Sequence, residues 1–450
     1  MKGLSLFSNV GIAETYLHEV GVDIVVANEL LVERAEFYKH LYPECHMITG
    51  DITNPSVFNE VIRESKAQNV DFILATPPCQ GMSIAGKTKW GNEGENTEDA
   101  RNYLITYVIE AIRQLSPKYV MLENVFMQLQ TYINFDGNRY LIPDLIDTLL
   151  GCEYYIEKKV IDTKYYGVPQ QRKRAIILLS KKACCQRWEF PEYDKEIVTL
   201  EQAIGDLPSL DPLVKEPEYR CMFPEFEKKR KLGYEVSKWH QPRMHVWRNI
   251  EVMMHTPTGQ SARKNPVYYP KKTNGEMVGG APRTYMRMDW SKAAPTITMF
   301  NHTISSFQNV HPGRQLDNDL YSDPRVLTIF EMLRVMSLPD NWDIPSWANE
   351  GYLVAPNIDE DDDFMNELNG FTITKRDRVL RGWQVSTGLV REYMEYAREV
   401  EKEDLELSEL FVSLSENEAK ISSQLLMKRA LSENLMKIQL SKNYMMNILK

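Results

Sequence analysis

The 450-residue chain lacks several features that would assign it to a well-defined class of protein. Its six cysteines form no CxxC pair, so their spacing indicates neither a zinc site nor a disulfide framework and favours a reduced, cytoplasmic protein. No apolar run is long enough to cross a membrane, and Met1-Lys2-Gly3 leads into a strand-like segment instead of a signal peptide. Without a GxGxxG loop, a dinucleotide cofactor is also disfavoured.

The chain has an uneven distribution of charge. Its net charge of −10, taken alone, argues against a nucleic-acid partner. Between Glu227 and Trp290, however, thirteen lysine and arginine residues stand against five acidic ones. Acidic residues gather elsewhere, as in the run 359–363 and the C-terminal tail. A local basic segment is what phosphate binding requires, so the middle of the chain is a candidate nucleic-acid surface.

The first 180 residues alternate between strand-like and helix-like patterns. Strand-like runs occupy 3–7, 23–27, 46–48, 71–74, 119–122, 156–161 and 175–179. Helical patterns occupy 12–20, 31–41, 57–66, 101–115 and 141–150. Continuous apolar strands that alternate with helices predict a parallel α/β sheet covered on both faces, wired in the doubly wound, Rossmann-like manner.

Beyond residue 181 the regular alternation of strand and helix patterns ends. We assign 1–181 to the first part of a catalytic and cofactor-binding domain, and 182–323 to an irregular second domain that holds the basic stretch. Residues 324–400, with a helical pattern at 326–336, are expected to complete the catalytic domain. Residues 401–450 read as a helical extension. Its apolar stripe predicts a packing or self-association face, formed by Leu431, Leu435, Ile438, Met445 and Leu449.

The most informative stretch is 75–83, which contains Pro77-Pro78-Cys79-Gln80. Two prolines after a buried strand force an extended turn, so Cys79 should lie at a rigid elbow beyond the carboxyl end of that strand. Ligands of open α/β sheets bind at this edge. A thiol held there is either a nucleophile with a lowered pKa or a small buried side chain in a turn.

Three turns at the same predicted edge suit an adenosine. The turn 7–11 opens onto a helical pattern, Glu29 lies about twenty residues beyond it, and Asp51 follows the third strand. One acid there is uninformative, but two acids and a turn describe an adenosine pocket. With no pyrophosphate loop, the sequence favours a ligand without phosphates, such as S-adenosylmethionine.

Two later segments complete the candidate site. Glu123-Asn124 ends the strand that follows the Cys79 strand, and a carboxylate facing a thiolate permits acid–base chemistry on a ring. Gln170-Gln171-Arg172-Lys173-Arg174 opens the last strand, and its alternation places Arg172 and Arg174 on one side. Such guanidinium groups hold a phosphate or a base carbonyl, although a charged strand entrance is also common.

Together these segments resemble a known family. Pro78-Cys79-Gln80, Glu123-Asn124-Val125 and Gln170-x-Arg172-x-Arg174, in this order, resemble the signature motifs of the cytosine-5 DNA methyltransferases. Asp99 to Leu104 resembles the family's fifth motif, and Arg325 to Thr328 with Glu331 and Arg334 resembles its ninth. The resemblance covers roughly 4–180 and 295–395 and implies an S-adenosylmethionine-dependent methyltransferase with a target-recognition domain.

The resemblance also implies a role for each residue. Cys79 would attack carbon 6 of a cytosine that is rotated out of duplex DNA, and Glu123 would bond N3 and the amino group of that ring. Arg174 would hold the base carbonyl, and Arg172 would support the catalytic loop. Phe7 would face the adenine, Glu29 the ribose, and Asp51 with Ile52 the adenine edge. The residues expected to line the cofactor site are Phe7, Ser8, Asn9, Gly11, Glu29, Leu30, Asp51, Ile52, Pro78 and Leu104.

The chain departs from the family pattern at two of these positions. Asn9 stands where a glycine is usual, and Leu30 where an aromatic residue often stacks on adenine. We expect a DNA cytosine-5 methyltransferase of a bacterial or phage restriction-modification system, with a restriction endonuclease as its genetic partner and no membrane partner. The alternatives are a tRNA cytosine-5 methyltransferase, a non-catalytic DNA-binding paralogue, and a thiol-based oxidoreductase, which would need a resolving cysteine.

Overall fold

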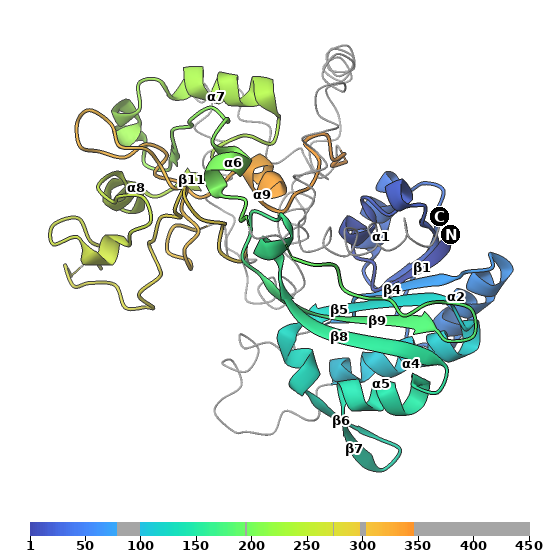
Figure 1. The fold of residues 1–450 in the computed structure, drawn as a ribbon. Helices are drawn as coiled ribbons and strands as arrows, with labels where there is room; N and C mark the ends of the chain where they lie inside the picture. The colour runs from blue at the N-terminus through green and yellow to red at the C-terminus, as the bar shows by residue number, and fades with distance from the viewer. Residues whose placement is uncertain (79–99, 194–195, 273, 298–302, 346–450) are drawn as a thin grey trace. The chain divides into compact units, whose positions relative to one another are not determined.

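The seven apolar runs of the N-terminal region form one sheet in the computed structural model of the chain (Figure 1). The strands are β1 (Lys2–Leu6), β2 (Asp23–Glu29), β3 (His46–Thr49), β4 (Phe72–Ala75), β5 (Tyr119–Val125), β8 (Tyr154–Asp162) and β9 (Lys173–Lys181). Their order across the sheet is β3-β2-β1-β4-β5-β9-β8. β1 lies between β2 and β4, so the chain winds outward in two directions and the α/β doubly wound prediction is confirmed.

The structure describes residues 1–78, 100–193, 196–272, 274–297 and 303–345. Cys79 and the whole of 346–450 are outside these ranges, and so is the predicted helical extension. The described residues divide into two units. The first contains 1–166 and 172–193, and the second contains 167–171 and the described residues from 196 onward. The predicted boundaries at 181, 323 and 400 stay predictions.

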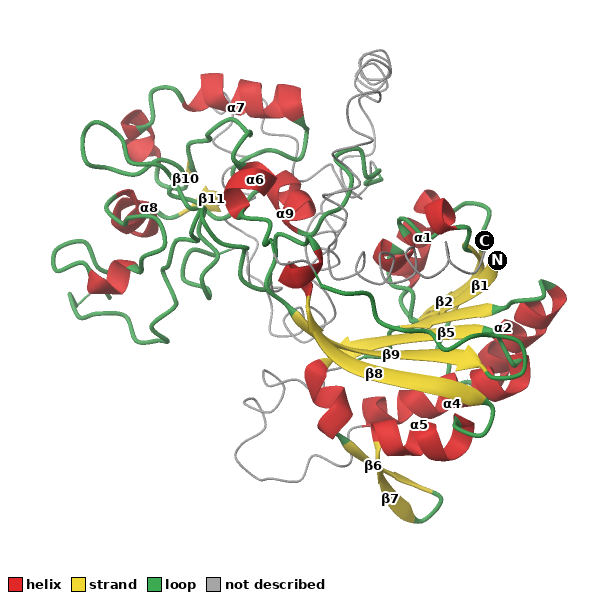
Figure 2. Cartoon of the chain, in the orientation of Figure 1, coloured by secondary structure: helices red, strands yellow, loops and turns green. Residues whose placement is uncertain are grey.

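Helices cover both faces of the sheet in the first unit (Figure 2). α2 (Pro55–Ala67), α4 (Leu104–Leu115) and α5 (Ile142–Leu150) share one hydrophobic cluster with the buried side chains of β1, β4 and β5. α1 (Val32–Leu41) packs Ala35 and Tyr38 against Ala27 in a separate cluster. Each fully buried leucine or isoleucine contributes about 1.5–3 kcal/mol, so these layers supply much of the stability that holds the strand ends in place.

One strand, β9, differs from the predicted parallel arrangement. β9 pairs antiparallel with both β5 and β8, whereas the first five strands are parallel. The reason is the connection between β8 and β9, which holds only the short 3-10 helix Thr163–Tyr166 and a loop. A parallel crossover requires a dozen or more residues, usually with a helix, and this connection has none. The amino end of β9 therefore lies beside the carboxyl end of β5.

Two local predictions also differ from the structure. The pattern at 12–20 forms two 3-10 helices, Ile12–Glu14 and His18–Val20, instead of one α-helix. A hairpin that the sequence analysis did not propose joins β6 (Tyr132–Phe135) to β7 (Asn138–Leu141). Its turn residues Asp136 and Gly137 both have positive φ, of 49° and 76°, which is the backbone of a tight two-residue hairpin. The remaining 3-10 helices of this unit are Ala100–Tyr103 and Phe126–Gln130.

The second unit has short elements joined by long loops, as predicted for an irregular domain. Its elements are α6 (Leu200–Ile204), α7 (Phe226–Val236), α8 (Trp247–Met254), α9 (Ile329–Val335), the strand pair β10 (Leu213–Val214) and β11 (Met244–His245), and 3-10 helices at Pro217–Met222 and Ala262–Lys264. α9 begins with a capping box, in which the Thr328 hydroxyl accepts the backbone N–H of Glu331 and the Glu331 carboxylate accepts that of Thr328.

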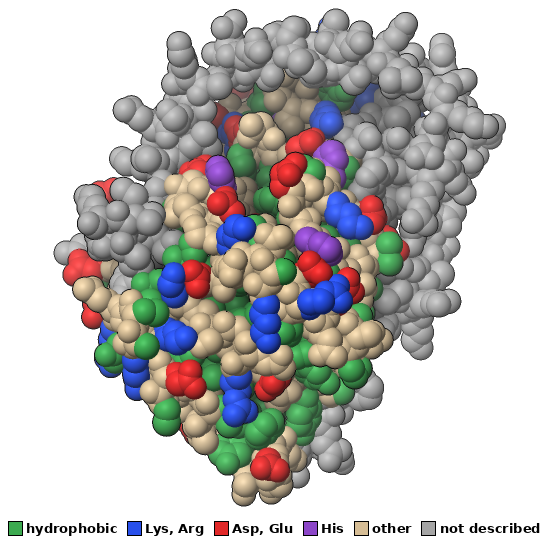
Figure 3. Space-filling model, turned by 90° about the vertical axis from the view of Figure 1, so that its right-hand side faces the viewer, with side chains coloured by type: hydrophobic (Ala, Val, Ile, Leu, Met, Phe, Trp, Pro, Cys, Tyr) green, Lys and Arg blue, Asp and Glu red, His purple; other side chains and the backbone are tan. Residues whose placement is uncertain are grey.

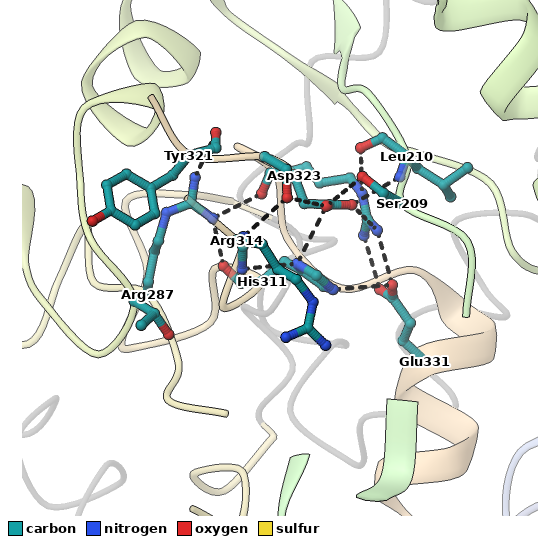
Figure 4. Close-up of polar contacts among 12 residues, drawn as sticks. Ser209, Leu210, Arg287, His311, Arg314, Tyr321, Asp323 and Glu331 are labelled. Carbon is teal, nitrogen blue, oxygen red and sulfur yellow. Dashed lines mark hydrogen bonds and ion pairs between the residues drawn. The ribbon is translucent and has the colours of Figure 1, made fainter. Parts of the chain in front are cut away.

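A buried network of charged side chains holds this unit together (Figure 4). Arg325, which has no exposed surface, donates two hydrogen bonds of 2.8 Å to Glu331 and one of 2.8 Å to Asp323. Arg287 donates to the carbonyl oxygens of Met253 and His311, both at 2.8 Å. Burial alone would raise the pKa of Glu331, but the charge of Arg325 outweighs it and lowers that pKa to about 2. The charged residues of the ninth motif are therefore structural here.

The described residues carry mixed charge on the face that Figure 3 shows and contain no helix that could span a membrane. The face shown in Figure 3 carries lysine and arginine side chains interspersed with aspartate and glutamate, without a field of one sign. Among the described residues, every helix is too short or too polar to span a bilayer. The basic excess of the sequence lies between Glu227 and Trp290, within the second unit.

Candidate active site

The turn that leads to Cys79 is tied to its neighbours by side-chain hydrogen bonds. Asn124 is 2% exposed, and its Nδ2 donates to the carbonyl oxygen of Pro77 at 3.0 Å. The hydroxyl of Thr76 donates to the carbonyl oxygen of Phe7 at 2.9 Å. These bonds fix the two residues before Pro78 against β5 on one side and the β1 turn on the other. Cys79 lies outside the described residues but follows Pro78 directly in the sequence.

Glu123 and Arg174 form an ion pair at the same end of the sheet. Arg174 Nε donates to Glu123 Oε1 at 3.1 Å, and each side chain is 12% exposed. The register explains the pair, because Arg174 lies opposite Val125 on β5 and so shares a face with Glu123, two residues earlier. A carboxylate beside a guanidinium group offers an acceptor and donors to one polar ring. The antiparallel direction of β9 brings Arg174 to this edge.

Arg172 is positioned through its backbone. Its N–H donates to Asp162 Oδ1 at 3.1 Å, and its carbonyl oxygen accepts the N–H of Thr163 at 2.9 Å. Burial alternates along the segment as predicted: Gln170 is buried, Arg172 and Arg174 are half-buried, and Gln171 and Lys173 are exposed. Arg172 and Arg174 therefore share a side of the chain, as the sequence analysis expected.

The residues just before Arg172 belong to the second unit. Gln171 donates its backbone N–H to the carbonyl oxygen of Ala294 at 2.7 Å, and the N–H of Ala294 donates to the carbonyl oxygen of Pro169 at 2.8 Å. The hydroxyl of Thr296 adds a bond of 2.8 Å to the carbonyl oxygen of Gln171. The loop between β8 and β9 is thus paired with backbone from more than a hundred residues later.

The turn after β1 has an unusual backbone. Phe7, Asn9 and Gly11 have φ values of 58°, 56° and 83°. Asparagine tolerates this left-handed conformation better than most residues, which explains how Asn9 replaces the expected glycine. At Gly11 a Cβ would lie 2.2 Å from the ring of Tyr42, whose hydroxyl donates to the Gly11 carbonyl oxygen at 2.6 Å. Only glycine fits there.

Glu29 connects this turn to the end of β2. Its carboxylate accepts the backbone N–H of Asn9 at 2.9 Å and that of Leu31 at 3.1 Å, and Arg34 lies 3.8 Å away. Glu29 is 5% exposed. A carboxylate has about four acceptor positions, so capacity remains for a ribose hydroxyl. Leu30 beside it is 49% exposed, which leaves its side chain available to an apolar ligand surface.

The remaining predicted cofactor residues are at the ends of neighbouring elements. Asp51 follows β3 and is exposed, with its Oδ1 accepting the N–H and hydroxyl of Thr53, and Ile52 beside it is 3% exposed. Leu104 begins α4 and packs on the core cluster of the sheet. The backbone N–H of Gly50 donates to the Glu29 carbonyl oxygen at 2.9 Å, which holds the β2 and β3 turns together.

Sequence reasoning missed two side chains that build this edge. Asn28 is buried, and its Nδ2 donates to the carbonyl oxygens of Ile48 and Gly50 at 2.9 and 3.1 Å. The ring of Tyr42 packs against Gly11 and fills the space beside it. An asparagine at the end of an apolar strand was the available signal for Asn28, because a buried amide needs partners. Nothing in the sequence indicated Tyr42.

The edge accommodates S-adenosylmethionine by its chemistry. The two carboxylates at successive strand ends, Glu29 and Asp51, offer polar contacts to a ribose, and the exposed Leu30 offers an apolar surface to a purine. Among the described residues no group of three histidine, cysteine, aspartate or glutamate side chains could hold a metal ion. The carboxylates of Glu29 and Asp51 suit the hydroxyl groups of a nucleoside better than a phosphate, because two like charges repel.

Comparison with known proteins identifies the family. The family model for C-5 cytosine-specific DNA methylase matches residues 1–357. The chain belongs to this family. Members of this family of DNA (cytosine-5)-methyltransferases take the methyl group from S-adenosylmethionine, so the methylase activity and the cofactor are those that the sequence analysis predicted.

Named relatives of this methylase agree. It is 45% identical over 345 residues to the Type II methyltransferase M1.HgaI of Avibacterium volantium, which covers 77% of this chain and 90% of that protein. It is 26% identical over 346 residues to the Type II methyltransferase M.Eco47II of Escherichia coli, and this match covers 75% of this chain and 71% of that protein. A crystal structure described as a DNA modification methyltransferase of an E. coli prophage is 18% identical, with a TM-score of 0.51 over 89% of this chain and 98% of that one, and supports the fold.

Proposed function

We propose that Cys79, Glu123, Arg172 and Arg174 carry the methylation of cytosine at carbon 5. The observation that carries this proposal is the hydrogen bond from Asn124 to Pro77, beside the 3.1 Å pair between Glu123 and Arg174. It ties the segment that bears Cys79 to the strand that bears the carboxylate. In this proposal the thiol of Cys79, which directly follows Pro78 in the sequence, acts at the edge of the sheet where Glu123 and Arg174 pair.

Each side chain has a balanced chemical task in this proposal. The Cys79 thiolate forms a bond to carbon 6 of a cytosine rotated out of the duplex, and the ring electron pair moves to carbon 5. Glu123 bonds N3 and the amino group, which stabilises the charge that this attack moves onto the ring. After carbon 5 gains the methyl group, it loses its proton, and the bond between sulfur and carbon 6 breaks. Arg174 holds the base carbonyl, and Arg172 supports the loop.

The cofactor supplies only the methyl group, and the chain positions it. Glu29 would accept the ribose hydroxyls with its remaining acceptor positions, Asp51 and Ile52 would meet the adenine edge, and Phe7 would face the ring. The turn Ser8-Asn9 to Gly11 would meet the methionine end, with Pro78 and Leu104 closing the site. The positive φ values at Phe7, Asn9 and Gly11 support this part, because tight turns of this kind allow the backbone to approach a ligand closely.

The biological role that we propose is modification in a Type II restriction-modification system. The relatives named as Type II methyltransferases support it. In this role the enzyme acts in the cytoplasm on double-stranded DNA, and a cognate restriction endonuclease is a genetic partner. The irregular second unit, with its basic excess, would hold phosphates and read base edges. Self-association through the apolar stripe at 431–449 remains a separate proposal, because the stripe lies outside the described residues.

A methyl-transfer assay tests the substrate. Purified protein with tritiated S-adenosylmethionine should label duplex DNA and leave tRNA unlabelled, and label on tRNA alone would contradict the proposal. Bisulfite sequencing of DNA from cells with and without the protein then gives the recognition sequence. Duplex DNA with 5-fluorocytosine at that site should form a covalent complex with the wild type but not with Cys79→Ala. A trapped Cys79→Ala complex would refute the nucleophile.

A further inference from the structure

A hollow at the edge of the catalytic sheet has no role in the site described above. It has a volume of about 470 Å³ and lies at the end of β8, within the first unit. Lys159, Asp162, Tyr165, Lys173 and Tyr193 are among the side chains that line it. Sites for small organic ligands usually measure roughly 300–1,000 Å³, so the hollow is large enough for a nucleotide unit. Because β8 is the last strand, side chains from both faces of the sheet reach it.

Two tyrosines form an exposed aromatic wall. Tyr165 is 38% exposed and Tyr193 is 62% exposed, with their ring centroids 5.9 Å apart and their planes tilted by 56°. The ammonium group of Lys164 lies 4.8 Å from the centre of the Tyr165 ring. Exposed aromatic rings combined with cationic side chains are the usual means by which proteins hold nucleotides without reading their sequence.

The lysines of this hollow are not neutralised by carboxylates. Within the described ranges, neither Lys159 nor Lys173 has an ion-pair partner, and Lys159 Nζ lies 5.6 Å from the ring of Phe190. Asp162 is the acidic side chain of the lining, and its Oδ1 already accepts the backbone N–H of Arg172. Two such lysines beside aromatic rings suit a phosphate, which satisfies their charge where the protein does not.

The register of the sheet places this hollow close to the catalytic carboxylate. Lys159 lies opposite Ile176, and Ile176 lies opposite Glu123, so Lys159 and Glu123 share one row and one face of the sheet. Neighbouring strands are about 4.8 Å apart, which separates the two backbone positions by roughly 10 Å. One strand of duplex DNA rises about 3.4 Å per nucleotide, so this distance corresponds to roughly three nucleotides.

We propose that this hollow binds one nucleotide unit of the DNA strand, roughly three nucleotides from the cytosine at Glu123. Lys159 and Lys173 pair with the phosphates that flank this nucleotide, and its sugar packs on Tyr165 and Tyr193. The inference rests on the methylase acting on DNA. The contact lies outside the second unit and touches no base edge through a fixed donor or acceptor, so it adds affinity without adding sequence preference.

Charge-neutral variants of the lysines test the proposal. Lys159→Gln, Lys173→Gln and the double variant are compared with the wild type by fluorescence anisotropy on duplex DNA over a range of salt concentrations. Each lost phosphate contact should reduce the slope of log affinity against log salt by up to about 0.9, and the double variant should lose more than either single one. The matched control is Lys182→Gln, an exposed lysine that follows the opposite end of β9, which should keep the wild-type slope.

Two further measurements separate this proposal from loss of the fold and from failure of the proposed function. All variants should bind S-adenosylmethionine as the wild type does and melt at the same temperature. The wild type must methylate DNA, since a wild type without activity would refute the proposed function instead. A wild type that methylates DNA and a double variant with an unchanged salt slope would overturn the hollow as a DNA contact.

Neutral phosphate analogues distinguish a DNA strand from a free nucleotide. A methylphosphonate is placed at single positions two to four nucleotides from the target cytosine, on either side. At one or two of these positions the wild type should lose affinity and the double variant should not. If no position behaves in this way, while a deoxynucleoside monophosphate binds the wild type but not the double variant, the ligand is a free nucleotide and the DNA-strand proposal is wrong.

Discussion

The side-chain amide of Asn124 donates a hydrogen bond of 3.0 Å to the carbonyl oxygen of Pro77. This one contact connects the end of β5 to the turn that precedes Cys79, across 47 residues of sequence. Asn124 is buried, and its Oδ1 in turn accepts the N–H of Val125 at 2.8 Å. Both the Nδ2 and the Oδ1 of the amide are therefore hydrogen-bonded, which fixes the side chain in one orientation.

Loss of the Asn124 amide should slow methyl transfer without weakening cofactor binding. Asn124→Asp keeps the size but replaces the donor with a carboxylate that faces the Pro77 carbonyl oxygen. A turn displaced by about 1 Å costs roughly 100-fold in rate, and an unsatisfied buried carbonyl costs about 1–3 kcal/mol of stability. Single-turnover assays with tritiated cofactor measure the rate. A variant with the wild-type rate would show that the turn holds its position without this bond.

The pair between Glu123 and Arg174 should behave as one unit. Glu123→Gln and Arg174→Gln should each reduce methyl transfer by about 100-fold or more, because each removes charge that acts on the ring. The double variant should be much less impaired than the product of the two effects, since the pair is broken by either change. The exposed pair Lys118 and Asp71 provides the control, and Lys118→Gln should leave the rate unchanged. Additive effects at Glu123 and Arg174 would argue for separate roles.

The left-handed backbone at Asn9 should matter more than its side chain. Asn9→Gly should keep both stability and cofactor affinity, whereas Asn9→Ala should cost about 1–2 kcal/mol and weaken S-adenosylmethionine binding. Asn69 is a matched control, because it is exposed, has a φ of 57° and belongs to the turn after α2. Asn69→Ala should lower the melting temperature similarly and leave cofactor affinity unchanged by calorimetry. Equal loss of cofactor affinity in both alanine variants would refute the local role of Asn9.

The second unit should lose stability in mild acid because of His311. Burial lowers the pKa of His311 to about 4, against the opposite effect of Asp323 and Glu331, and its Nδ1 accepts the backbone N–H of Gly313. In the unfolded chain the pKa returns to 6.5. Between these values the unfolded state binds more protons, so the free energy of unfolding falls as the pH falls from 6.5 towards 4.

Urea unfolding at a series of pH values measures this effect. Between pH 6.5 and 4, His311 should lower the free energy of unfolding of the wild type by on the order of 3 kcal/mol. The decrease should be smaller in His311→Asn, which keeps an acceptor for the N–H of Gly313. His46→Asn, a change at an exposed position of β3, is the control. Glu331, with a pKa lowered to about 2 in the folded state, adds a further loss only below about pH 4.5. An unchanged pH dependence in His311→Asn would exclude His311 as the source.

Much of the catalytic sheet was predictable because its strands are continuous apolar runs. Leu4, Ile73 and Val120 lie in such runs and are fully buried, as expected for strands covered on both faces. The direction of β9 was not predicted, although the absence of a helical pattern between Ile161 and Ala175 was a usable signal. The β6–β7 hairpin was missed for a similar reason, because the Asp136-Gly137 pair was not weighed as a turn signal.

The sequence predicted which residues form the candidate site, but not which groups these residues contact. The motifs led to Glu123 and Arg174, and the structure brings these two together. The contacts of Glu29 with backbone N–H groups could not be inferred, because backbone donors leave no trace in a sequence. The burial of Asp323, Arg325 and Glu331 was also hidden: the three are close in sequence, but charged side chains usually lie on the surface.

The bonds that hold Gln171 to Ala294 and Thr296 have a consequence for how this enzyme discriminates between DNA sequences. One peptide bond separates Gln171, which belongs to the second unit, from Arg172, which belongs to the first. Under the proposed function, binding energy gained where the second unit contacts its correct DNA sequence would help to set the arginines in place, as well as lengthen the time that the DNA stays bound. The enzyme would then discriminate between DNA sequences by its rate of methyl transfer as well as by its affinity. An incorrect sequence would be bound but methylated slowly.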